Sequence, residues 1–191
     1  MNQKNLLEVD WSKIPAPADD GAARHLTGMM IPPLDLIATD NSSVRLSALK
    51  GRTVVFAYPR TGEPGKISLV DDWDMIPGAR GCTPQTCAFR DLFAELKAAG
   101  AQQVFGLSTQ EHSYQCEMAA RLHLPFAVLS DEKLALTRAL DLPTMEVAGL
   151  TLIKRLALIV DHGKISHVFY PVFPPDRNAG DVLAWLKANP G

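Results

Sequence analysis

The sequence predicts an α/β fold in which helices cover a central β-sheet. Two observations carry this prediction: short apolar runs with strand character recur along the chain, and segments with helical periodicity separate them. The chain has 191 residues and is 47% hydrophobic, which is ample for one core. We therefore expect one domain over residues 28–191, preceded by an N-terminal arm over residues 1–27.

The expected elements follow from local pattern. The arm is irregular, contains Pro15 and Pro17, and shows no sustained period. The run 161–164, Asp-His-Gly-Lys, is typical of a turn between two strands. The expected strands are 53–58, 103–108, 126–129, 156–160 and 165–170, and the expected helices are 86–99, 110–122, 134–140 and 181–188.

Charge and composition exclude several functional classes. The 19 basic and 21 acidic residues are mixed along the chain and give a net charge of -2, so no nucleic-acid or polybasic membrane surface is expected. No 18-residue apolar run predicts a membrane span. The N-terminus lacks an apolar signal-like region, so we expect a cytoplasmic protein whose disulfides are transient.

The most informative motif is Gly-Cys-Thr-Pro-Gln-Thr-Cys-Ala-Phe-Arg-Asp over residues 81–91, which holds two of the three cysteines. Apolar residues at helical spacing follow it, and Thr83 and Pro84 fit a helix cap and first helical position. Cys82 is therefore expected at the positive end of a helix. Unpaired N–H groups and the helix dipole favour a reactive thiolate at such a position.

The spacing between Cys82 and Cys87 also has a geometric meaning. Five residues of regular helix advance about 7.5 Å and turn about 140° beyond a full turn, so the two sulfurs would face different directions. A disulfide requires Cα atoms within about 7 Å, so this pair joins only if the first helical turn unwinds. The motif therefore indicates a switching pair, and the alternative is two small buried residues or a fixed staple.

The motif resembles that of the peroxiredoxins, most closely the bacterioferritin-comigratory-protein or Q type, in which Gly-Cys-Thr-x-x-x-Cys-x-Phe-Arg-Asp carries the peroxidatic and resolving cysteines. The resemblance extends over residues 28–186. Further matching segments are Pro32-Pro33-Leu34, Ala38-Thr39-Asp40, residues 50–55 leading to Tyr58-Pro59, Gly106-Leu107-Ser108, Leu124-Pro125-Phe126, Leu129-Ser130-Asp131, and Arg155 with Asp161 and Gly163.

The resemblance implies a thioredoxin-like fold with a central mixed β-sheet and thiol-dependent reduction of hydrogen peroxide or organic hydroperoxides. Cys82 would become a sulfenic acid and Cys87 would resolve it as an intramolecular disulfide. Thioredoxin or a glutaredoxin-like dithiol would then reduce the disulfide. No cofactor or metal is expected, and a homodimer is compatible with this family.

Arg155 is the third candidate catalytic residue. It precedes the apolar run 156–160, so its guanidinium is expected at the edge of a buried strand. By resemblance it is the arginine that lies beside the peroxidatic sulfur, where it would stabilise the thiolate and bind the peroxide oxygens. The alternative is that Arg155 or the adjacent Lys154 is a solvated charge at a strand end.

One departure from the family pattern concerns Pro-x-x-x-Thr-x-x-Cys, whose threonine hydroxyl hydrogen-bonds at the active site. Position 79 is alanine, and residues 60–81 separate Pro59 from Cys82. If Pro59 is the family proline, residues 62–80 are an insertion and Thr61 follows the proline too closely for a simple match. Alternatively, Pro77 takes the proline's part and Thr83 or a backbone N–H supplies the missing donor.

The insertion 62–80 has three interpretations. It mixes proline and glycine with apolar residues, so it could be a lid whose Trp73 and Met75 line a pocket for an organic peroxide. An apolar stretch in a long loop is equally typical of a packing anchor or a subunit contact.

Other chemistry-bearing residues form no motif. Cys116 lies in a helical pattern without a spaced partner and is interpreted as a bystander, and the five histidines are dispersed. Two alternatives to an enzyme are a thiol redox sensor and a thioredoxin-fold binding module with a decayed site. Absence of Cys-x-x-Cys argues against a general disulfide reductase.

Overall fold

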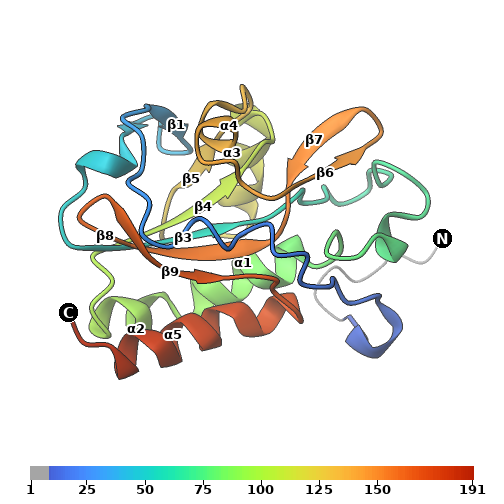
Figure 1. Ribbon diagram of the computed structural model, residues 1–191. Coiled ribbons are helices and arrows are strands. Elements are labelled where there is room, and N and C mark those ends of the chain that lie inside the picture. The colour runs from blue at the N-terminus through green and yellow to red at the C-terminus, as the bar shows by residue number, and fades with distance from the viewer. Residues whose placement is uncertain (1–8) are drawn as a thin grey trace.

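The computed structural model describes residues 9–191 (Figure 1). Its main sheet has seven strands in the order β2-β1-β5-β4-β3-β8-β9. These strands are β1 (Leu36–Ala38), β2 (Ser43–Val44), β3 (Arg52–Ala57), β4 (Gln103–Ser108), β5 (Val128–Ser130), β8 (Leu156–Asp161) and β9 (Lys164–Phe169). Parallel β3, β4 and β5 form the centre, and the outer pairings are antiparallel, so the predicted mixed sheet is confirmed.

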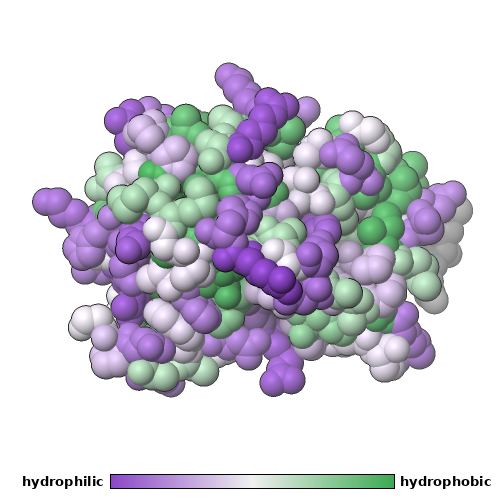
Figure 2. Space-filling view, viewed as in Figure 1, coloured by the Kyte–Doolittle hydropathy of each residue, from purple (hydrophilic) through white to green (hydrophobic). Residues whose placement is uncertain are grey.

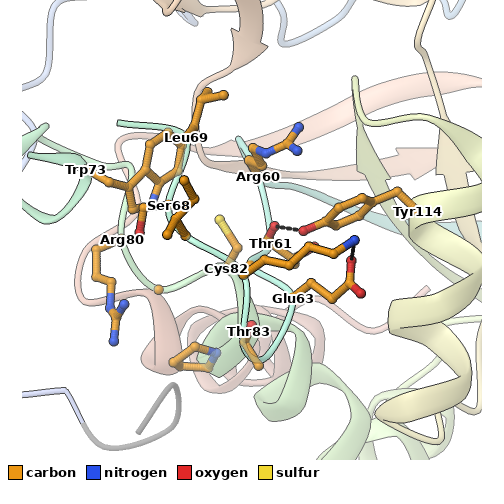
Figure 3. A pocket seen from close by; sticks show the side chains of 15 residues that line it. Arg60, Thr61, Glu63, Ser68, Leu69, Trp73, Arg80, Cys82, Thr83 and Tyr114 are labelled. Carbon is orange, nitrogen blue, oxygen red and sulfur yellow. Dashed lines mark hydrogen bonds and ion pairs between the residues drawn. The ribbon is translucent and has the colours of Figure 1, made fainter. Parts of the chain in front are cut away.

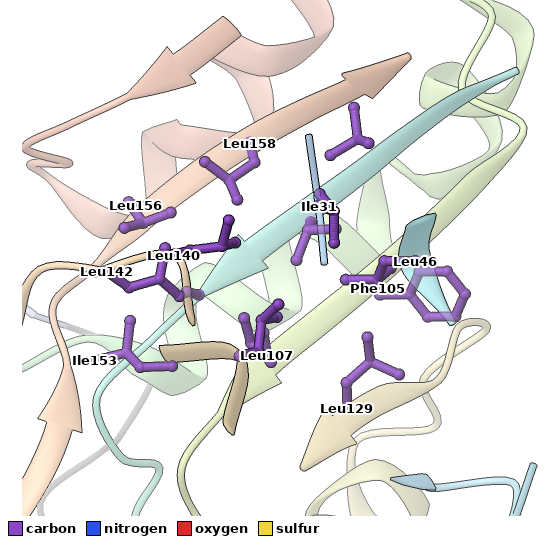
Figure 4. Packing of buried hydrophobic residues seen from close by; sticks show 14 of the residues in the cluster. Ile31, Leu46, Phe105, Leu107, Leu129, Leu140, Leu142, Ile153, Leu156 and Leu158 are labelled. Atoms are coloured by element: carbon purple, nitrogen blue, oxygen red, sulfur yellow. The ribbon is translucent and has the colours of Figure 1, made fainter. Parts of the chain in front are cut away.

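Alternating residues of the central strand β3 divide the interior into two cores. Val54 and Phe56 belong to a core on one face of the sheet, whereas Val55 and Ala57 belong to the core on the other. This is the two-residue period of a strand buried on both faces. Figure 4 shows residues of the second core, including Leu107 from β4 and Leu158 from β8.

The helices are distributed unequally over these cores. Helices α1 (Cys82–Asp91), α2 (Phe93–Ala98), α3 (His112–Arg121) and α5 (Asn178–Ala188) contribute to the Val54–Phe56 core, and α4 (Ala135–Ala139) contributes to the other. Figure 1 shows α1, α2 and α5 together below the sheet. The ring of Phe89 in α1 stacks on Phe56 with centroids 4.1 Å apart. Such an aromatic pair contributes about 0.5–1.5 kcal/mol beyond its area, which anchors α1 to the strand.

Two details of the predicted helix over 86–99 are wrong. The segment forms two helices, because α1 ends at Asp91 and α2 begins at Phe93 after a break at Leu92. The cap is Gly81 rather than Thr83, and α1 begins at Cys82. Pro84 is therefore the third helical residue, where its missing N–H costs no intrahelical hydrogen bond because first-turn N–H groups have no such partner.

Four strands lie outside the sequence prediction. Strands β1 and β2 extend the sheet edge, and β6 (Thr144–Val147) pairs with β7 (Leu150–Ile153) in a separate hairpin. The hairpin gains its partner from the insertion 62–80: Trp73 and Ala79 pack with Val147 and Leu152 in a third apolar cluster. The insertion is thus anchored on the hairpin.

The described part of the N-terminal arm, residues 9–27, lies against the domain. Trp11 Nε1 donates a 2.8 Å hydrogen bond to Asp176, and its ring meets Phe173 edge-on at 6.0 Å. Asp20 accepts hydrogen bonds from Lys154 at 2.6 Å and from Tyr170 at 2.8 Å. Residues 1–8 of the expected arm lie outside the described residues.

Polar side chains cover most of the face drawn in Figure 2, and hydrophobic ones gather at its right, over the β6–β7 hairpin. Leu150, at the start of β7, is 43% exposed. Across residues 9–191, no helix combines the length and the apolar character needed to cross a membrane.

Candidate active site

The backbone holds Cys82 at the first position of α1. Gly81, the residue before it, has φ +102°, a left-handed conformation that side chains other than glycine rarely adopt. A Cβ at Gly81 would lie 2.6 Å from Trp11 Cη2 and 2.7 Å from Pro175 Cγ. Only glycine therefore fits between the arm, the segment before α5 and the reactive cysteine.

Gly81→Ala is expected to lower the free energy of unfolding by about 1–3 kcal/mol from overpacking, in addition to backbone strain, and to slow oxidation of Cys82. Gly100→Ala is the matched control, because Gly100 has φ +104° but nothing lies within 4 Å of its Cβ position. Thermal unfolding of both variants measures the two losses of stability, and we expect the larger loss in Gly81→Ala. Equal destabilisation would show that the contacts of Gly81 with Trp11 and Pro175 carry no cost.

Arg155 lies beside the sulfur. It immediately precedes β8 and is 2% exposed, and its Nη2 donates to Cys82 Sγ at 3.2 Å. The carbonyl oxygens of Gly78, Ala79 and Arg80 also lie 3.1–3.2 Å from this nitrogen and share its two N–H groups with the sulfur. A buried guanidinium, which carries a positive charge and N–H donors, thus lies at the sulfur. The structure therefore brings Cys82 and Arg155 together, as the sequence predicted.

A chain of buried amides orients the guanidinium. Arg155 Nη1 donates to Gln85 Oε1, and Gln85 Nε2 donates to Asn178 Oδ1 at 2.9 Å. Gln85 is 0% and Asn178 is 1% exposed. These hydrogen bonds link Arg155 to the starts of both α1 and α5. Because buried hydrogen-bonded groups are costly to displace, they hold the guanidinium in place.

Tyr58 packs in the same core as Cys82. Its hydroxyl is buried without a hydrogen-bond partner among residues 9–191. Burial raises the pKa of Tyr58 well above its usual value, and the charge of a Cys82 thiolate raises it further. Tyr58 therefore stays a neutral phenol and retains a free proton donor near the sulfur.

Cys82 opens into a cavity of about 340 Å³. Figure 3 shows its sulfur between Trp73 and Leu69 on one side and Tyr114 on the other. Thr61 lines the same cavity, and its hydroxyl donates to Gln110 Oε1 at 3.1 Å. The insertion and the loop after β3 thus both form walls of the cavity that Cys82 lines.

The placement of Thr61, Thr83 and Pro77 bears on the two alternatives for the missing threonine. Thr61 comes from the loop that follows Pro59 and reaches the cavity that contains Cys82, whereas Pro77 lines a different cavity of about 250 Å³. Thr83 also lines the Cys82 cavity, but Ala79 is buried against Trp73. Thr61 and Thr83 thus both line the cavity despite the alanine at position 79, and both alternatives stay open.

Cys87 lies about 1.4 turns after Cys82 on α1 and is 7% exposed. Burial raises the pKa of its thiol, and Arg90 partly opposes this effect. Both Cys82 and Cys87 are free thiols. Cys116, on α3, instead contacts His112 Nε2 at 3.4 Å and the carbonyl oxygen of Thr39 at 3.7 Å, and does not line the cavity of Cys82.

Sequence reasoning missed several residues around the site. Gln85 carried a usable signal, because a residue three positions after Cys82 lies one helical turn away. Tyr114 and Asn178 carried none, since only tertiary packing brings them near positions 61 and 85.

Comparisons with known proteins agree with this geometry. The redoxin family model matches residues 17–183. The chloroplastic peroxiredoxin Q of rice, Oryza sativa subsp. japonica, is 31% identical over 163 residues, which are 84% of this chain and 66% of that protein. The chain therefore spans just under two thirds of this relative's length.

Two solved structures are similar in fold and sequence. The peroxidoxin BcpB of Mycobacterium tuberculosis has a TM-score of 0.68 and 25% identity, with 86% of this chain and 98% of that one covered. The bacterioferritin comigratory protein of Xanthomonas campestris, described for its alkyl peroxide reduction activity, has a TM-score of 0.64 and 25% identity over 81% of this chain and 90% of that one. Together with the cysteine motif and the mixed sheet, these matches show that the chain belongs to the redoxin family as a Q-type peroxiredoxin of the thioredoxin-fold superfamily.

Proposed function

We propose that the protein is a thiol-dependent peroxidase in which Cys82 reduces a peroxide. The observation that carries this proposal is the 3.2 Å contact between Arg155 Nη2 and Cys82 Sγ at the wall of an open cavity. It supports the proposal because a guanidinium and a cavity meet at one sulfur. Family membership and the alkyl peroxide activity described for the Xanthomonas campestris relative support the same reaction.

In the first step, the Cys82 thiolate attacks the outer oxygen of the peroxide and the O–O bond breaks. The sulfur is oxidised to a sulfenic acid, and the other oxygen leaves as water or an alcohol after it takes a proton. Arg155 would stabilise the thiolate and then the charge that develops on the leaving oxygen. Tyr58, a neutral phenol with a free proton, is the candidate that donates a hydrogen bond to the sulfur or the reacting oxygen.

In the second step, the Cys87 thiol would condense with the sulfenic acid to form a disulfide and release water. The cysteines occupy one regular helix, so the first turns of α1 must unwind before the sulfurs meet. Unwinding breaks the Gln85 contacts with Arg155 and Asn178. A thioredoxin or glutaredoxin-like dithiol would reduce the disulfide and restore both thiols.

We also infer a reducing compartment such as the cytoplasm, because the cycle needs a dithiol donor and starts from reduced Cys82 and Cys87. The rice peroxiredoxin Q is named as chloroplastic, which is a different compartment from the cytoplasm.

Steady-state turnover of hydrogen peroxide and an alkyl hydroperoxide, each with and without thioredoxin and its reductase, tests the function. The proposal predicts sustained turnover that requires the dithiol. Slow turnover with rapid formation of the disulfide would instead favour a redox sensor. Absence of both peroxide turnover and disulfide formation would favour a binding module.

A further inference from the structure

The cavity at Cys82 has an unbalanced charge. Among residues 9–191, its wall carries the cations Arg60, Lys66 and Arg80 but only one carboxylate, Glu63. Lys66 pairs with Glu63 at 2.6 Å, and Arg80 pairs with Asp74 at 3.4 Å. These two cations are therefore neutralised locally.

Arg60 differs from the other two. Among residues 9–191 it has no carboxylate partner, and its guanidinium carbon lies 5.0 Å from the centre of the Tyr114 ring. The Tyr114 hydroxyl donates to the carbonyl oxygen of Thr61 at 3.1 Å, which fixes the ring. A cation stacked on a fixed ring is positioned, but its N–H groups stay available to a ligand.

The opposite wall is apolar. Trp73 is 8% exposed and packs on the β6–β7 hairpin, and Leu69 lies beside it. Figure 3 shows Trp73 and Leu69 on one side of the sulfur and Arg60 with Tyr114 on the other. A cavity of about 340 Å³ lies at the small end of ligand pockets, which span roughly 300–1,000 Å³.

We propose that the preferred substrate is a compact organic hydroperoxide that carries a carboxylate, with the carboxylate bound by Arg60 and the hydrocarbon against Trp73 and Leu69. This inference rests on the peroxidase function proposed above and assigns its substrate class. Arginine suits the role because its planar guanidinium binds a carboxylate with two hydrogen bonds. The chemistry at Cys82 is unchanged: the O–O bond breaks, Cys82 becomes a sulfenic acid, and the product is the corresponding hydroxy acid.

Cumene hydroperoxide and its ring-carboxylated analogue form a matched probe pair that differs only in the anion. We expect stopped-flow oxidation of the wild-type protein to be about tenfold faster with the carboxylated probe at low salt, and the preference to shrink as salt is added. Arg60→Gln should bring the ratio of the two rate constants to about one, and Arg60→Lys should restore part of it. Arg138→Gln removes an exposed charge on α4 and should leave the ratio unchanged.

A second measurement separates this inference from the peroxidase function. The carboxylated and uncarboxylated cumyl alcohols, which are the expected products, are titrated into Cys82→Ser protein and followed by tryptophan fluorescence. Tighter binding of the carboxylated alcohol that Arg60→Gln removes supports the anion site, even if neither peroxide is turned over. The proposed anion site is overturned if the ratio of the two rate constants is near one in the wild-type protein. It is also overturned if the preference for the carboxylated probe survives Arg60→Gln.

Discussion

Cys82→Ser is expected to reduce peroxide turnover to the level of buffer without protein. A serine hydroxyl has no easily oxidised anion at neutral pH, so the sulfenic acid cannot form at position 82. Serine is close in size to cysteine, and the fold should be retained because the surrounding contacts of α1 remain. The measurement is steady-state consumption of hydrogen peroxide and an alkyl hydroperoxide, with circular dichroism to verify folding.

Cys116→Ser is the matched control, since Cys116 faces His112 and Thr39 rather than the cavity. It should turn over peroxide at the wild-type rate. Normal turnover by Cys82→Ser, or loss of turnover in Cys116→Ser, would assign the chemistry to another residue.

Arg155→Met is expected to slow sulfenic-acid formation by roughly 10²–10³-fold, the usual cost of removing one preorganised electrostatic donor. Methionine fills much of the space but cannot donate to Cys82 Sγ, so less thiolate forms and the leaving oxygen loses its cation. Thiolate absorbance at neutral pH and stopped-flow oxidation by peroxide both measure the effect. Arg155→Lys should recover only part of the rate, because an ammonium keeps the charge but not the two-pronged geometry.

Lys154→Met is the control for charge at the same strand end. Lys154 binds Asp20 at 2.6 Å, so its loss should loosen the arm but leave the oxidation rate close to wild type. Because Arg155 also binds the carbonyl oxygens of residues 78–80, thermal unfolding of Arg155→Met must accompany the kinetics. A folded Arg155→Met protein with wild-type thiolate and rate would make the arginine structural.

The sequence was sufficient for the parts of the fold that have a strong local period. Strands β3, β4, β8 and β9 and helices α3 and α5 were expected within a few residues of their observed bounds, because their apolar patterns are set locally. The hairpin β6–β7 was missed because its buried residues Val147 and Leu152 pack against Trp73 and Ala79 of the insertion. A contact between segments so distant in the chain leaves no local pattern.

The candidate site was likewise only partly predictable from the sequence. Cys82, Cys87 and Arg155 carried recognisable chemistry, and the structure places Cys82 and Arg155 in contact. Thr61 was discounted because its spacing from Pro59 departs from the family pattern, yet the loop after β3 brings it into the cavity. Arg60, which has no carboxylate partner among residues 9–191, had no signal in the sequence, because only the ion pairs of its neighbours distinguish it.

The most direct test of the proposed cycle is peptide mapping by mass spectrometry after one equivalent of peroxide is added to the reduced protein. The account predicts a single intramolecular cross-link between Cys82 and Cys87 in nearly every molecule, which requires α1 to unwind between them. A cross-link between Cys82 and Cys116, a bridge between two molecules, or an oxidised Cys116 beside an unmodified Cys82 would contradict it.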